Sequence, residues 1–119
     1  MKINPNLIKD IYSTTETLTN KIWEDGKPVY RKVFKGTSTA TFSTGLTSVD
    51  NVIKMDMLIR ESGTSHGWRN LPWLFNTTST SWLGGFYFNT STGNIAFQVG
   101  SDLGAIDRFV LIMEYTKTS

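Results

Sequence analysis

Cysteine is absent from this sequence of 119 residues, which excludes disulfides and thiolate metal sites. The single histidine, His66, leaves no pair of histidines for a metal site or for acid–base catalysis. No stretch approaches the length of a membrane span, and the first residues contain no apolar core of a signal peptide. The 12 basic and 10 acidic side chains are scattered without a run of one sign, which gives no argument for nucleic-acid binding.

Common catalytic motifs are also missing, because the sequence has no glycine-rich phosphate loop, nucleophile elbow or zinc motif. Asp50 and Asp56 could form a carboxylate pair for glycoside hydrolysis. Asp56, however, shares a strand face with Lys54 and Arg60, a pattern that solvated charge pairs explain better. We therefore expect a protein that is not an enzyme and that uses no metal or cofactor.

Serine, threonine and asparagine are abundant, and 13% of the residues are aromatic. The short polar side chains compete with the hydrogen bonds of a helix backbone, whereas aromatic residues favour strands. A chain of 119 residues has the size of one domain that can bury a core without disulfides. The composition predicts an all-β domain with short strands and polar loops.

A tight β-hairpin is predicted where Asp-Gly separates two runs of β-branched and aromatic residues. The residues that define it are Trp23, Asp25, Gly26, Pro28 and Tyr30. With a two-residue turn, Ile22 lies opposite Val29, and Leu18 lies opposite Val33. These four apolar side chains would then share the face that covers the core.

Seven or eight short strands follow from alternation and turn residues. Their predicted ranges are 17–24, 27–35, 39–43, 52–60, 68–75, 82–89, 94–99 and 106–116. Strands of this spacing predict an antiparallel β-sandwich or jelly-roll-like domain over residues 17–119. Residues 1–16 are expected to form a connector with a short helical turn, because Asn4-Pro5 suits a helix start.

Three of the predicted strands carry additional signals. Pro72 indicates that the strand at 68–75 is an edge strand. Gly84-Gly85 indicates a bulge or a close backbone approach. In the strand at 106–116, alternation places Phe109, Leu111, Met113 and Tyr115 on one face and Arg108, Val110, Ile112 and Glu114 on the other. Val110 and Ile112 make this second face apolar at its centre, so the strand is expected to be central in a sandwich or covered by another chain.

A ligand site is predicted around the tryptophans that flank two loops. The candidate residues are His66, Trp68, Arg69, Asn70, Trp73 and Trp82. Sugar recognition combines an aromatic face for the apolar side of a ring with amide or guanidinium donors for its hydroxyls. The alternative is that these tryptophans fill the core or a subunit interface.

Three segments of the sequence resemble proteins of a known class. Residues 11–16 read Ile-Tyr-Ser-Thr-Thr-Glu, residues 23–32 read Trp-x-Asp-Gly-Lys-Pro-x-Tyr-Arg-Lys, and residues 114–118 read Glu-Tyr-Thr-Lys-Thr. Together they resemble the C-terminal receptor-binding region of tail-fibre and baseplate proteins from phages and prophages of Gram-positive bacteria. The segment at residues 17–20 departs from the lead-in expected there.

The resemblance implies a homotrimeric, β-rich tip domain in the virion, made in the host cytoplasm, that attaches to a bacterial cell-wall or capsular glycan and joins other tail proteins. A purely structural tail or baseplate module is the alternative. A glycan depolymerase is a third hypothesis, which the lack of a plausible carboxylate pair disfavours.

Overall fold

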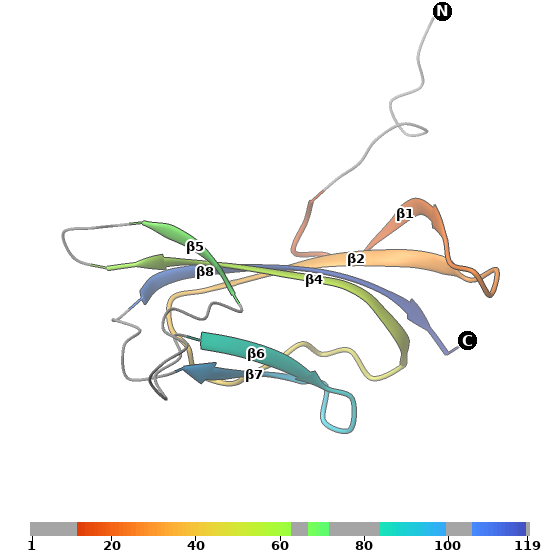
Figure 1. Ribbon diagram of the computed structural model, residues 1–119. Coiled ribbons are helices and arrows are strands. Elements are labelled where there is room, and N and C mark those ends of the chain that lie inside the picture. Colours follow the sequence, from red (N-terminus) through yellow and green to blue (C-terminus); the bar gives the residue numbers. More distant parts are fainter. Residues whose placement is uncertain (1–11, 63–66, 72–83, 100–105, 119) are drawn as a thin grey trace, which may run out of the picture.

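The computed structural model describes residues 12–62, 67–71, 84–99 and 106–118. They form eight strands in two antiparallel sheets (Figure 1). The strands are β1 (Thr17–Ile22), β2 (Pro28–Gly36), β3 (Phe42–Ser43), β4 (Val49–Glu61), β5 (Trp68–Leu71), β6 (Gly84–Asn89), β7 (Asn94–Val99) and β8 (Ile106–Lys117). The prediction of an all-β protein is confirmed, and nothing in the described part of the chain is a helix able to cross a membrane. The predicted helical turn lies almost entirely in residues 1–11, outside the described ranges.

The larger sheet has the strand order β1-β2-β8-β4-β5, so the last strand in the chain is the central one. Alternation along β8 places Phe109, Leu111, Met113 and Tyr115 on one face, and each is at most 4% exposed. Met57 and Ile59 of β4 join this face. We call it the inner face of the larger sheet.

The smaller sheet, β3-β7-β6, lies over this inner face (Figure 1). Its contribution to the core is largely aromatic, because the Phe42 and Phe97 rings lie 5.2 and 5.3 Å from that of Phe109. Ile95 of β7 is fully buried in the same cluster. The hydrophobic core therefore lies between the two sheets.

The hairpin of β6 and β7 lies close to the predicted ranges of 82–89 and 94–99. In it, Phe86 pairs with Phe97 and Phe88 with Ile95. Gly84-Gly85, in contrast, pairs with β7 without any shift in register, so the bulge expected at these glycines is absent.

The first hairpin turns where it was predicted to turn, but its register is different. The Trp23 amide donates to the Lys27 carbonyl at 2.9 Å, and the Gly26 amide donates to the Trp23 carbonyl at 2.8 Å. The last residue of this loop, Gly26, has a positive φ of 87°. This is a three-residue loop with a glycine bulge, instead of the two-residue turn that the sequence predicted.

The extra loop residue moves the pairing beside the turn by one position, so Ile22 lies opposite Pro28, where the prediction placed Val29. A further irregularity between Leu18 and Ile22 places Leu18 opposite Tyr30, three positions from the predicted Val33. The side chains of Leu18 and Ile22 are 61% and 67% exposed, so their predicted place on a core-covering face is wrong. Val29 is buried as expected. Tyr30 stacks on Tyr115.

Candidate functional site

The outer face of the larger sheet, which is turned away from the smaller sheet, holds part of the predicted site. Trp68 and Asn70 both lie on this face, because β5 pairs with β4 so that Trp68 faces Arg60 and Asn70 faces Leu58. Leu58 in turn faces Val110 of β8. Trp68 is 49% exposed, so its ring is accessible to a ligand.

Two rows of side chains cross this part of the outer face. The first row runs Arg108, Arg60, Trp68, and the second runs Lys35, Val110, Leu58, Asn70. Side chains that face one another on neighbouring strands have Cβ atoms about 4.5–5.5 Å apart. The sheet therefore brings together an aromatic ring, an amide, three cations and an apolar floor from four strands. We call these seven residues the Trp68 surface.

A β-bulge fixes the position of Arg60. The pairing of β4 with β8 shifts by one residue between Arg60 and Glu61, so Asp107 is the extra residue of β8. Its two carboxylate oxygens accept from Nε and an Nη of Arg60, each at 2.8 Å. The Arg60 guanidinium carbon lies 5.9 Å from the centre of the Trp68 ring. The bidentate pair thus holds a cation beside the ring.

A hollow of about 510 Å³ lies beside Trp68, between residues of both rows. Its lining includes Trp68, Lys35, Arg108 and Val110, and its remaining wall is formed by Gly36, Thr37 and Phe109. A Cβ at Gly36 would come within 2.1 Å of the Phe109 ring, so glycine is required there for the ring to pack. A second hollow, of about 400 Å³, lies beside Asn70 and Leu58.

Arg69 does not belong to this surface, although it stands between Trp68 and Asn70 in the sequence. It lies opposite Ile59, which points into the core, so its side chain leaves the sheet on the inner side. There Nε of Arg69 pairs with a carboxylate oxygen of Glu61 at 2.7 Å. The alternation of a strand could have separated Arg69 from its neighbours in the sequence. His66, Trp73 and Trp82 lie outside the described residues.

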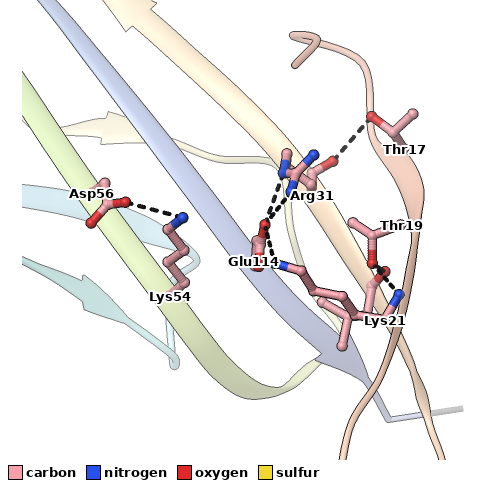
Figure 2. A network of polar contacts seen from close by, with 8 residues as sticks. Thr17, Thr19, Lys21, Arg31, Lys54, Asp56 and Glu114 are labelled. Atoms are coloured by element: carbon pink, nitrogen blue, oxygen red, sulfur yellow. Dashed lines mark hydrogen bonds and ion pairs between the residues drawn. The ribbon is translucent and has the colours of Figure 1, made fainter. Parts of the chain in front are cut away.

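A buried ion cluster occupies the opposite end of the outer face (Figure 2). Glu114 is 1% exposed and accepts from Nε of Arg31 at 2.9 Å and from Nζ of Lys21 at 3.1 Å. Arg31 is 2% exposed, and the ring of Tyr12 lies 4.4 Å from its guanidinium carbon. Burial raises the pKa of Glu114, but the hydrogen bonds and charges of Arg31 and Lys21 outweigh it and bring the pKa below its ordinary value. Glu114 and Arg31 are buried and paired with each other, so we assign this pair a structural role.

A third hollow, of about 310 Å³, includes Glu16, Lys32, Tyr115 and Lys117 in its lining. Tyr115 donates its hydroxyl hydrogen to Glu16, and Lys117 donates to the other oxygen of the same carboxylate. Burial and the contact with Glu16 raise the pKa of Tyr115, which keeps its hydroxyl protonated. The carboxylate is occupied by these two donors and is therefore poorly placed to act as a base.

The two aspartates weighed for hydrolysis are each paired with a lysine. Asp50 accepts from Lys27 at 2.6 Å, and Asp56 lies 3.3 Å from Nζ of Lys54 (Figure 2). Within the residues that the structure describes, no group of three or more His, Cys, Asp or Glu side chains could hold a metal ion. Neither of the two Asp–Lys pairs gives the described residues a catalytic centre.

Comparisons with family models, with curated proteins and with solved structures found no match to this chain.

Proposed function

We propose that this protein is a non-catalytic adhesion domain that binds a bacterial surface glycan through the Trp68 surface. The single observation that carries the proposal is the half-exposed Trp68 ring, which lies beside a hollow of about 510 Å³. An aromatic face can pack on the apolar side of a sugar ring, while Asn70 and Arg108 supply donors for its hydroxyls. Val110 and Leu58 add apolar area to the same floor.

The biological setting of the proposal comes from the sequence motifs. Residues 11–16, 23–32 and 114–118 resemble the receptor-binding region of phage tail-fibre and baseplate proteins of Gram-positive hosts. On this basis we infer a place at the tip of a phage tail and contacts with other tail proteins. The β-sandwich or jelly-roll-like architecture and the homotrimer belong to the same proposal.

The edge strand β1 is the surface at which we expect the three copies to meet. Leu18 and Ile22 are 61% and 67% exposed on this strand, and its outer edge has no neighbouring strand among the described residues. An edge strand that exposes large apolar side chains is a favourable surface for association. The Trp68 surface lies at the other side of the sheet, on β5, and stays free for a ligand.

Replacing Trp68 with alanine tests the adhesion hypothesis. The fluorescently labelled protein is incubated with a panel of Gram-positive bacteria, and bound cells are counted by flow cytometry. We expect the wild type to label some strains and W68A to reduce the affinity at least about thirtyfold, because a central aromatic contact contributes 2 kcal/mol or more.

Tyr87 provides the matched control, since it is 45% exposed on β6 of the other sheet. Y87A should label cells as the wild type does. If W68A labels them equally well, the site is wrong. If the wild type labels no strain but forms a trimer, the structural-module alternative is favoured.

A further inference from the structure

Two cations of the Trp68 surface have no acidic partner among the residues that the structure describes. Most basic side chains that the structure describes are bound: Arg60 to Asp107 and Arg69 to Glu61, for example. Within the described ranges, Lys35 and Arg108 alone among lysines and arginines form neither an ion pair nor a hydrogen bond. Both line the hollow beside Trp68.

The sheet places these two cations close together. Lys35 of β2 lies opposite Val110 of β8. Arg108 precedes Val110 by two residues in β8 and therefore lies on the same face. Such diagonal neighbours are about 7–8 Å apart, within reach of long side chains. Arg108 also lies directly opposite Arg60. Like charges in these positions repel one another and destabilise a sheet, so an anion bound between them would relieve that repulsion.

We propose that the glycan bound by the Trp68 surface is acidic, and that Lys35 and Arg108 bind its carboxylate or phosphate group. This inference rests on the proposed function and specifies its ligand class. The sugar ring packs on Trp68 and the apolar floor, while the anion lies between the two cations. Arg60 contributes less to this charge, because Asp107 already neutralises it.

The test compares two double variants that remove the same charge. K35Q/R108Q removes both cations of the hollow, whereas K27Q/K54Q removes two lysines that pair elsewhere with Asp50 and Asp56. Each 119-residue protein is passed over immobilised envelope polysaccharide from a strain that the wild type labels. We expect K35Q/R108Q to bind about two- to thirtyfold more weakly, because the variant loses the binding free energy of two exposed ion pairs. K27Q/K54Q should bind as the wild type does.

Chemical treatment of the same polysaccharide distinguishes the two sources of negative charge. Carbodiimide coupling to ethanolamine neutralises carboxylates, and cold hydrofluoric acid removes phosphate groups. Loss of wild-type binding after one treatment supports the proposal and identifies the anion. Raised ionic strength should weaken wild-type binding more than that of K35Q/R108Q.

Several outcomes would overturn the acidic-glycan inference while leaving the adhesion function intact. One is equal binding to treated and untreated polysaccharide that W68A still abolishes. Another is equal binding by K35Q/R108Q and the wild type. Equally tight binding to a short oligothymidine would mean that the cations serve nucleic acid instead. Failure of the proposed function itself differs from all of these, since the wild type would then label no strain.

Discussion

At the residue scale, Glu114 is the most deeply buried charged side chain among the described residues. Glu114 and Arg31 are buried partners from adjacent strands, β8 and β2. Removing one member of a buried pair leaves the other charge uncompensated. We expect Glu114→Gln to lower the free energy of unfolding on the order of 3 kcal/mol, measured by urea denaturation at pH 7. Asp56→Asn should change it by less than about 0.5 kcal/mol, because the pair with Lys54 is exposed.

The same variant has a defined pH dependence. The pKa of Glu114 lies below its ordinary value of 4.5 in the folded protein, since Arg31 and Lys21 outweigh the effect of burial. Its stabilising contribution is therefore complete above pH 4.5 and is lost as the pH falls through the folded pKa. The difference between wild type and Glu114→Gln should shrink steadily below pH 4.5. A constant difference from pH 7 to pH 3 would contradict this role.

The face of the sheet on which a side chain lies was predictable only where the alternation within its own strand determined it. The inner-facing residues of β8 were predicted correctly from their period of two. Glu114 was predicted on the other face of that strand, yet its burial could not be read from the sequence. Its partners Arg31 and Lys21 are 83 and 93 residues away, so only the strand pairing brings them together.

At the scale of elements, substitutions at two turn glycines with similar φ distinguish the effect of backbone strain from that of steric contact. Gly93 ends the β6–β7 turn with φ of 73°, and a Cβ there would lie 2.6 Å from the Leu46 carbonyl oxygen. Gly26 has φ of 87° but open space around the same position. We expect Gly26→Ala to cost about 1 kcal/mol from backbone strain and Gly93→Ala about 2–4 kcal/mol from strain plus crowding.

Thermal and urea denaturation of both glycine variants measure the two contributions. The Gly93 carbonyl accepts from the amide and the hydroxyl of Thr44, at 2.9 and 2.6 Å, so the crowded position also joins β7 to the segment after β3. Equal decreases in the free energy of unfolding of the two variants would show that the structure relieves the contact with Leu46 without a loss of stability.

The two hairpins show what local sequence can decide. The ranges of β6 and β7 were predicted nearly correctly because both strands carry a regular alternation of aromatic and apolar residues, although this alternation did not specify their pairing. The β1–β2 register was wrong because Asp25-Gly26 suits a two-residue turn and also a three-residue loop with glycine last. The bond from the Lys27 amide to the Asp25 carboxylate, at 3.0 Å, supports the longer loop.

At the scale of the whole molecule, the proposed trimer predicts a specific dependence on β1. Size-exclusion chromatography with light scattering should give three times the chain mass for the wild type. Leu18→Ser/Ile22→Ser should give a monomer of nearly unchanged stability, because both side chains are exposed in the single chain. Tyr87→Ser, at another exposed site, should remain trimeric. A monomeric wild type at micromolar concentration would contradict the trimer.

The composition of the Trp68 surface lay beyond prediction from sequence. Trp68 and Asn70 were named from local pattern, but Lys35 and Arg108 come from strands far away in the chain. Their proximity depends on the strand order of the larger sheet, which no turn or alternation specifies. The all-β class, in contrast, followed from composition alone.

The central position of β8 also sets the order of events during synthesis. β2 and β4 flank β8 in the sheet and leave the ribosome before it does, so both wait for a partner that is made last. At about 5–20 residues per second, β4 waits for several seconds with Met57 and Ile59 uncovered. The nascent chain is therefore exposed to aggregation until its final strand emerges, and slowing translation within residues 62–105 should lower the soluble yield.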